Sequence, residues 1–294
     1  MVKCNHYDSF RIVYNVVVLN RQPKLAGEAY KCSLEVARRN KVLLDFLGRL
    51  GISDHLIVRE EEKYRLFLAS LQEVSEVLEG EDFIFIKLYK PVRYVPSDMD
   101  VLVARDKLAS VARKLMRIGY IVEVVEPYTL TLVRKNRVID LYVHPSLAGV
   151  VYMDGNSLLW RRERVSFNSS IKIPSLSKGA EAALTAAHAI YKEKLYTLND
   201  YITISRWADG ETLQVCRENY CTDALRTALY INRKVDEGLV SLPYKIPTVK
   251  WAGMLLSKIV NDPLTRSTLP RMLYAVADRR FGKLLIDKFR RVSY

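Results

Sequence analysis

Short apolar runs and alternating patterns in the middle of the chain are typical of β-strands. These runs cover residues 83–86, 98–103, 120–125, 129–133 and 138–143. A helical pattern over residues 105–118 separates the second run from the third and ends at Gly119. The last two runs are joined by a polar turn at residues 134–137, which predicts a β-hairpin. The middle of the chain is therefore predicted to form a small mixed β-sheet with a covering helix.

Both ends of the chain show apolar residues at helical spacing instead. Before the sheet, helical patterns cover residues 28–50 and 60–78, whereas residues 1–20 resemble an amphipathic strand. After the sheet, helical patterns cover residues 180–195, 206–219, 222–237, 248–259 and 269–289. The predicted fold class is α/β (α+β). Its three parts are an N-terminal strand and helical segment (1–79), a core (80–173) and a helical C-terminal domain (174–294).

The composition is that of a folded protein, because 49% of the 294 residues are hydrophobic and 27% are charged. No apolar stretch reaches the roughly 18 residues that suggest a membrane span. The first residues lack the apolar run and small-residue cleavage site of a signal peptide. We therefore expect a cytoplasmic protein with no membrane partner.

The net charge of +13 and the pI near 9.5 favour a polyanionic partner. Nucleic acid, nucleotide phosphates and an acidic membrane surface are the candidates. The alternative is a basic thermophile protein without such a partner. Sparing use of glutamine, together with many Arg, Tyr and Val residues, indicates a thermophilic source.

Three aspartates form the main candidate for chemistry. Asp98 and Asp100 are two residues apart where the chain enters a predicted strand, so both carboxylates lie on one face. Asp140 begins another predicted strand, and the three carboxylates converge if the two strands are neighbours. Three hard oxygen donors suit Mg²⁺, and a pair of such ions would activate a hydroxyl and stabilise a leaving pyrophosphate. The alternative is that these aspartates are turn or cap residues at strand starts.

These motifs carry a resemblance to a known family. Lys87 follows the strand at 83–86, and Arg93 precedes Ser97-Asp98-Met99-Asp100 and the apolar residues 101–103. Further matches are Gly119-Tyr120, Asp140 with His144, and His188 with Asp200. On these motifs, residues 36–243 resemble the nucleotidyltransferase superfamily of polymerase β-like fold. The branch most similar to them is uncharacterised, bacterial and archaeal, and has a helical N-terminal part.

The resemblance implies transfer of a nucleoside monophosphate from an NTP to an acceptor hydroxyl, with Mg²⁺ or Mn²⁺ as cofactor. The resemblance implies that Asp98 and Asp100 hold both metal ions. It also implies that Asp140 helps to bind the catalytic metal and favours deprotonation of the acceptor hydroxyl. The positive charge favours RNA, such as a tRNA end, as the acceptor, and some relatives are toxins that modify tRNA.

The chain departs from the family at the glycine motif that normally precedes the acids. It has Lys87-Leu88-Tyr89 there, and no glycine between Gly80 and Gly119. Glycine at that place lets the backbone approach the triphosphate. In its absence, side chains are expected to bind the phosphates, namely Lys87, Lys90, Arg93 and Ser97. The alternative is a catalytically lapsed module that binds nucleic acid or a protein partner.

Several other residues have two interpretations. His144 is either a ligand-orienting residue or a half-buried strand-end histidine, and the second is favoured. His188 and Tyr191 are expected to be packing residues, and Asp200 a helix cap. Basic groups recur in four places and would line a nucleic-acid groove or form solvated faces. They are Arg113-Lys114 with Arg117, Arg134-Lys135 with Arg137, Arg161-Arg162 with Arg164, and the C-terminal Arg279, Arg280, Lys283, Lys288, Arg290 and Arg291.

Overall fold

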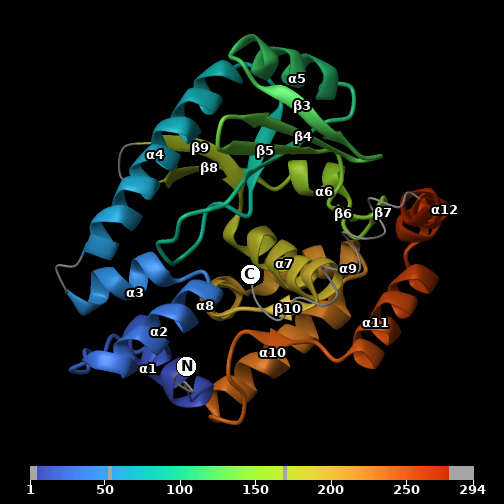
Figure 1. Cartoon of the computed structure of the whole chain (residues 1–294). Helices are drawn as coiled ribbons and strands as arrows, with labels where there is room; N and C mark the ends of the chain where they lie inside the picture. The colour runs from blue at the N-terminus through green and yellow to red at the C-terminus, as the bar shows by residue number, and fades with distance from the viewer. Residues whose placement is uncertain (1–4, 52–54, 168–170, 278–294) are drawn as a thin grey trace.

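The computed structural model describes residues 5–51, 55–167 and 171–277. A seven-stranded mixed sheet forms one half of the molecule, and helices form the other half and flank the sheet (Figure 1). The strands are β1 (Phe83–Ile86), β2 (Met99–Val103), β3 (Ile121–Val125), β4 (Thr129–Arg134), β5 (Arg137–Tyr142), β8 (Arg162–Phe167) and β9 (Ile171–Leu176). Their order across the sheet is β3-β4-β5-β2-β1-β9-β8. The pairs β2–β5 and β1–β9 are parallel, and the other neighbours are antiparallel.

Side-chain alternation divides the central strands between two cores. Phe83 and Phe85 of β1 face a core with α4 (His55–Val77) and α5 (Leu108–Arg117). Ile84 and Ile86 face the opposite core, which belongs mostly to the later helices. Successive side chains in a strand point to opposite faces, so a four-residue apolar strand contributes to both cores.

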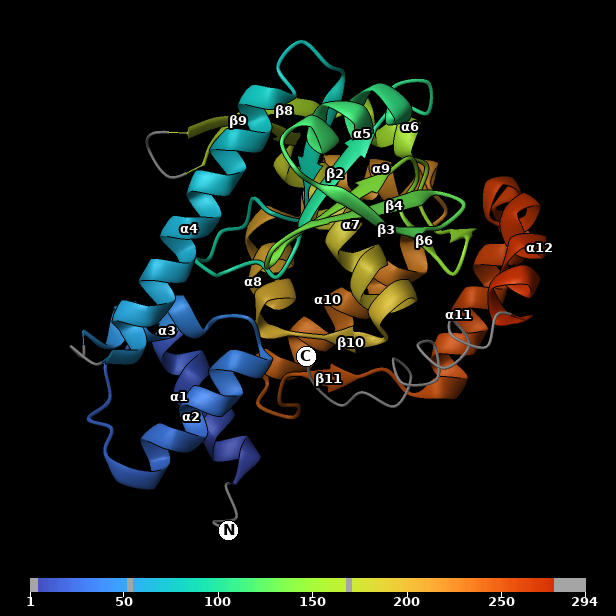
Figure 2. The same ribbon diagram turned by 45° about the horizontal axis from the view of Figure 1, so that its top comes forward.

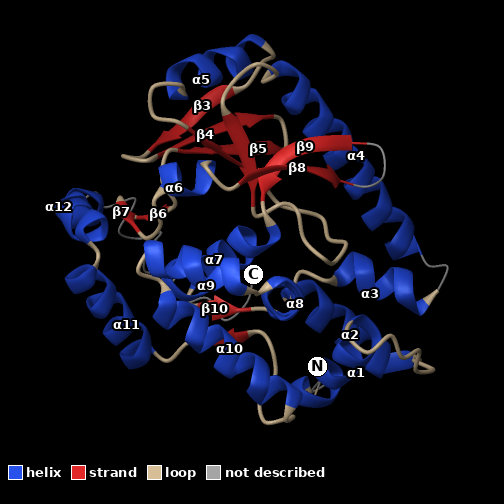
Figure 3. Cartoon of the chain, turned by 180° about the vertical axis from the view of Figure 1, so that it is seen from behind, coloured by secondary structure: helices blue, strands red, loops and turns tan. Residues whose placement is uncertain are grey.

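The helices after the sheet occupy the half that Figure 3 shows almost entirely in blue. They are α7 (Lys178–Ala187) with its π-helical continuation η1 (His188–Glu193), α8 (Leu198–Trp207), α9 (Gly210–Glu218), α10 (Thr222–Asp236), α11 (Thr248–Asn261) and α12 (Pro263–Ala277). The short helix α6 (Gly155–Leu159) and the two-stranded ribbons β6–β7 (Ser146–Leu147, Val150–Val151) and β10–β11 (Leu195–Tyr196, Tyr244–Lys245) complete this part. Within the described residues, no helix combines the length and apolar character that a membrane crossing requires.

The N-terminal helices α1 (His6–Val17), α2 (Gly27–Arg39) and α3 (Leu43–Leu50) lie beside the later helices (Figure 2). The Tyr14 hydroxyl donates a hydrogen bond of 2.8 Å to Asp236, and the Tyr7 hydroxyl donates one of 2.7 Å to the Gly238 carbonyl. Phe10 and Val13 share a core with the later helices. Helices α1, α2 and α3 and the helices after the sheet therefore form one helical layer on one side of the sheet.

The structure confirms a mixed sheet with helices at both ends, and corrects three details of the prediction. Residues 1–20 were predicted to include a strand, but α1 is a helix. Its buried Phe10, Val13, Tyr14 and Val17 are spaced as on one helical face, and Asn5 caps it. The pattern at residues 28–50 contains two helices, α2 and α3, with Gly51 ending the second in a left-handed conformation.

The third correction concerns the size of the sheet. The prediction ended the core at residue 173 and placed a break at Pro174, but Pro174 lies inside β9, whose neighbour β8 was also missed. β8 is an edge strand whose first three residues are charged and exposed, which hides the alternation of Val165 and Phe167. A proline also argues against a strand on sequence grounds. The predicted helix at 269–289 begins within α12, and its residues after 277 lie outside the described part.

Candidate metal and nucleotide site

The three aspartates converge, as expected if the strands of Asp98 and Asp140 are neighbours. β2 and β5 are parallel neighbours, and their register places Asp100 directly beside Asp140. Asp98 precedes β2 by one residue and shares the face of Asp100. One ligand atom from each of the three lies within 4.8 Å of the others. We call Asp98, Asp100 and Asp140 the aspartate cluster.

Each carboxylate of the aspartate cluster has a different environment. Asp98 Oδ1 accepts a hydrogen bond of 3.0 Å from the Ser97 hydroxyl, and Asp140 Oδ1 accepts one of 2.6 Å from the Thr131 hydroxyl. Asp100 is only 4% exposed, and its Oδ1 accepts no hydrogen bond of good geometry. The Lys87 ammonium lies 2.7 Å from that oxygen as an ion-pair partner.

The charges around Asp100 change its acidity. Burial raises the pKa of Asp100 to about 6, and the neighbouring carboxylates of Asp98 and Asp140 add to the increase. The Lys87 ammonium opposes this shift but does not cancel it. Burial and like charges therefore destabilise the ionised form of Asp100, as expected for a carboxylate placed for function.

Lys87 is held in a defined position by both of its backbone polar groups. Its φ of 62° is left-handed, which is uncommon for a residue with a side chain. The Lys87 N–H donates a 3.0 Å hydrogen bond to Glu181 Oε2, and its carbonyl accepts a 2.6 Å bond from the Tyr94 hydroxyl. Its ammonium lies 4.9 Å from the centre of the Tyr142 ring, a cation–π distance. The chain thus adopts a glycine-like turn here without a glycine.

A cavity of about 660 Å³ opens beside the cluster, a size that suits a nucleotide-sized ligand. Five basic side chains line it, from the loops and helices on every side: Arg38, Lys41, Lys87, Lys90 and Lys192. Asp98, Asp100, Glu193 and Asp200 are its acidic lining residues. The π-helical turn η1 contributes His188, Lys192 and Glu193, and such turns are frequent at functional sites.

The structure brings together three of the four predicted phosphate-binding residues. Lys87, Lys90 and Ser97 line the cavity, although the Lys90 ammonium is bonded to Glu181 at 2.7 Å and to Thr185 at 2.6 Å. Arg93 does not join them. It pairs with Glu61 at 2.8 Å and lines a separate cavity of about 390 Å³.

His144 and Asp200 have the structural roles that were favoured on sequence grounds, whereas His188, expected to be a packing residue, lines the cavity. His144 is buried, and its Nδ1 accepts a 2.9 Å hydrogen bond from the Gly155 N–H. Asp200 forms a capping box with Thr197 at the start of α8, and it also lines the cavity. His188 lies at the cavity wall, with Nδ1 3.1 Å from the Tyr152 hydroxyl.

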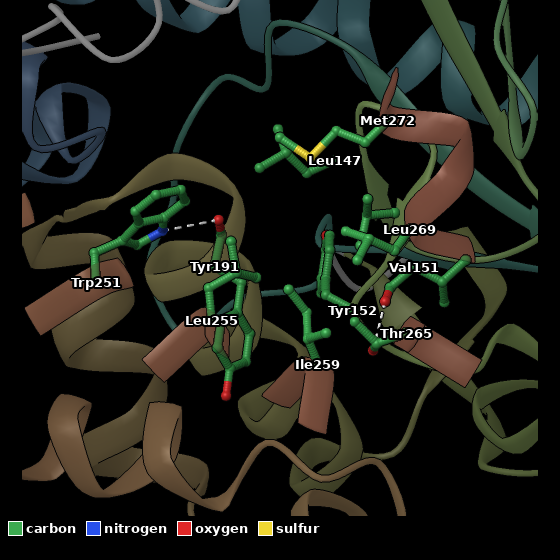
Figure 4. A pocket seen from close by; sticks show the side chains of 11 residues that line it. Leu147, Val151, Tyr152, Tyr191, Trp251, Leu255, Ile259, Thr265, Leu269 and Met272 are labelled. Carbon is green, nitrogen blue, oxygen red and sulfur yellow. Dashed lines mark hydrogen bonds between the residues drawn. The ribbon is translucent and has the colours of Figure 1, made fainter. Parts of the chain in front are cut away.

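Tyr191 is a packing residue, as expected. Its side chain is 1% exposed and borders a small apolar hollow among η1, α11, α12 and the β6–β7 ribbon (Figure 4). The Trp251 indole donates a 3.2 Å hydrogen bond to the Tyr191 carbonyl, and Thr265 donates one of 2.8 Å to the Val151 carbonyl. The hollow measures about 30 Å³, far below the roughly 300 Å³ at which pockets for small-molecule ligands begin.

Many of the predicted basic groups are paired with acids. Arg134 and Arg137 both bond to Glu73, Arg161 bonds to Glu218 at 2.9 Å, and Lys114 bonds to Glu81 at 2.9 Å. The C-terminal basic residues from Arg279 onward lie outside the described residues. Within the described part, the basic side chains that face the aspartate cluster are the ones that line the cavity.

Sequence reasoning missed several residues of this site. Thr131 orients Asp140, while Lys192 donates a 3.0 Å hydrogen bond to the Tyr142 hydroxyl. Lys192 lies four residues after His188, and this spacing places two residues on the same face of a helix. The sequence could therefore have indicated Lys192 as a neighbour of His188. Arg38 and Lys41 come from the N-terminal helical layer, and nothing in the local sequence connects them to the sheet.

No protein-family model matches the chain, and no curated protein matches it significantly. The geometry of the site is therefore the basis for a functional conclusion.

Proposed function

We propose that the cavity is the active site of a divalent-metal-dependent nucleotidyltransferase. The reaction would move a nucleoside monophosphate from an NTP to an acceptor hydroxyl and release pyrophosphate. The observation that carries the proposal is the convergence of three aspartate ligand atoms within 4.8 Å at the edge of a basic cavity.

The donor atoms fit a hard divalent cation. All are carboxylate oxygens, the ligand type that Mg²⁺ and Mn²⁺ prefer. Asp98, Asp100 and Asp140 each offer one oxygen, and these atoms lie within 4.8 Å of one another. A bound divalent ion would polarise the phosphoryl group and lower the pKa of the acceptor hydroxyl.

The chain's own residues then have distinct tasks. Asp98, Asp100 and Asp140 would hold the cation, and the Thr131 hydroxyl keeps Asp140 in place. Arg38, Lys41 and Lys192 offer positive charge to the triphosphate along the cavity wall. Catalysis in this class is mainly positioning and charge neutralisation, which such a wall supplies. The net charge of +13 favours RNA as the acceptor.

The test is label transfer. The protein is incubated with Mg²⁺ or Mn²⁺, each α-labelled NTP in turn, and total RNA, alongside Asp98→Ala and Asp140→Ala. Asp106→Asn is the matched control, since Asp106 is an exposed aspartate after β2 whose only ion-pair partner among the described residues is Lys107, at 3.5 Å. Label transfer by wild type and by the control, lost in both cluster variants, supports the proposal. Transfer that persists in the cluster variants refutes it.

One observation favours a second candidate, the lapsed module. Lys87 already gives Asp100 a cationic partner at 2.7 Å, as an internal counter-ion would in a site that no longer binds metal. A lapsed module would show no transfer with any NTP, no Mn²⁺ binding, and salt-sensitive RNA binding that survives Asp98→Ala.

A further inference from the structure

The register of the sheet places Lys87 and Asp140 on opposite sides of Asp100. Asp100 is the partner of Asp140 in β5 on one side and of Ile86 in β1 on the other. Lys87 follows Ile86 directly and returns its ammonium to 2.7 Å from Asp100 Oδ1. This ammonium also lies against the Tyr142 ring of β5, so the cluster already has one cation at Asp100.

The surrounding contacts fix the position of this ammonium. Glu181 and Tyr94 bind the two backbone polar groups of Lys87, and the Tyr142 ring lies 4.9 Å from its Nζ. The Lys87 side chain is only 13% exposed. A lysine that bound phosphates from a flexible loop would not need a left-handed backbone whose N–H and C=O groups are both hydrogen-bonded.

Charge balance also indicates that the aspartate cluster takes a single divalent ion. Three ionised carboxylates carry three negative charges, and the Lys87 ammonium cancels one of them. A single divalent ion cancels the remaining two, whereas two ions would leave an excess of positive charge in a buried site without substrate.

We infer that the Lys87 ammonium permanently takes one of the two cation positions of the aspartate cluster, so that the protein binds a single divalent ion. This inference rests on the metal site proposed above and specifies how many ions that site takes. The lysine supplies this cation from a left-handed turn that has a side chain in place of glycine.

The experiment counts Mn²⁺ ions by the electron paramagnetic resonance signal of free Mn²⁺ during titration of metal-free full-length protein. Wild type is expected to bind about one ion per chain, and Lys87→Met about two, because the methionine keeps the length of the stem without the charge. Lys87→Arg, which keeps a cation, is expected to remain at one ion.

Lys114→Met is the matched control. It removes one lysine and one ion pair, with Glu81 at 2.9 Å, from α5 on the opposite face of the sheet. It is expected to bind one ion, which separates a local effect from a change in net charge. Circular dichroism checks that each variant is folded.

Two ions in wild type, or one ion in a folded Lys87→Met variant, overturns the inference and leaves the proposed metal site standing. No ion in either protein overturns the metal site as well. If Lys87→Met does not fold, the wild-type and Lys87→Arg counts still decide, because a count of two in either contradicts the occupied position.

Discussion

Two buried carboxylates on the same side of the sheet differ in how completely the fold satisfies them. Glu181 on α7 has no exposed surface, and its two oxygens accept hydrogen bonds from the Lys90 ammonium and the Lys87 N–H. Asp100 is also buried, but it lies among like charges, and its ion-pair partner is the Lys87 ammonium at 2.7 Å. We refer to the first arrangement, Glu181 with Lys87, Lys90 and Thr185, as the Glu181 anchor.

The difference separates a structural charge whose partners are complete from a charge that the proposed metal ion would balance. A buried carboxylate with all its partners holds the β1–β2 loop to α7, and removing it leaves its lysine unpaired. A buried carboxylate among other carboxylates costs stability, and it persists where a ligand restores the balance. The Lys90 ammonium pairs with Glu181, and the Lys87 ammonium pairs with Asp100.

The largest effect is expected from the aspartate cluster itself. Asp140→Ala should lower the transfer rate at least about a thousandfold, because the lost metal contact is worth several kcal/mol in the transition state. Its free energy of unfolding should change by less than about 1 kcal/mol, since a repulsive charge disappears along with the Thr131 hydrogen bond. Initial rates and urea unfolding measure the two quantities. If Asp140→Ala lowers the free energy of unfolding by much more than this, Asp140 has a structural role like that of Glu181 instead.

The Glu181 anchor should behave in the opposite way. Glu181→Ala should lower the free energy of unfolding by about 3–5 kcal/mol, because it leaves the Lys90 charge buried without its partner. Urea unfolding followed by circular dichroism measures this loss. Glu181→Gln, which keeps an acceptor oxygen, should lose less. A change below about 1 kcal/mol in the alanine variant would remove the distinction between the two arrangements.

Asp200 tests the comparison through pH. The Asp200 carboxylate accepts hydrogen bonds from Thr197, just as Glu181 accepts them from its partners. Burial nevertheless raises the pKa of Asp200 above its usual value of 3.8. The folded protein therefore binds a proton at higher pH than the unfolded chain does, so the free energy of unfolding rises as pH falls through the folded pKa. Urea unfolding between about pH 7 and pH 4 should show a smaller rise in Asp200→Asn than in wild type. Identical profiles would contradict the raised pKa.

The smallest effect is expected at an exposed carboxylate. Glu73 on α4 bonds to Arg134 and Arg137, and the hydrogen bond from Arg134 lowers its pKa. All three side chains are partly exposed, so Glu73→Gln should cost less than about 1 kcal/mol. The difference should disappear in about 1 M salt, where exposed charges are screened. A loss as large as that of Glu181→Ala would show that burial is not what separates the two.

Much of the fold could be predicted because it is recorded in local patterns. The apolar runs at β1, β2 and β5 and the helical spacing of α4 and α5 are visible in the sequence. β8 and β9 could not be found, since exposed arginines and an internal proline conceal their alternation. Residues 1–20 were predicted to form a strand, because several valines at the end of α1 are typical of strands. The observed element α1 is a helix.

The sequence alone determined the chemistry of the aspartate cluster and its geometry along the chain. Asp98 and Asp100 share a face because side chains alternate in a strand, whatever the rest of the protein does. The absence of glycine before them was equally plain. These are consequences of local covalent geometry.

Only the tertiary structure decided what surrounds the cluster. Packing placed β5 beside β2 and so brought Asp140 to Asp100. It bonded the Lys87 N–H to Glu181, 94 residues away, and directed the Lys87 ammonium to Asp100 and the Lys90 ammonium to Glu181. Partners so distant in sequence are selected by the burial of two cores and by the need to satisfy buried charge, and neither requirement leaves a periodic signal in the chain.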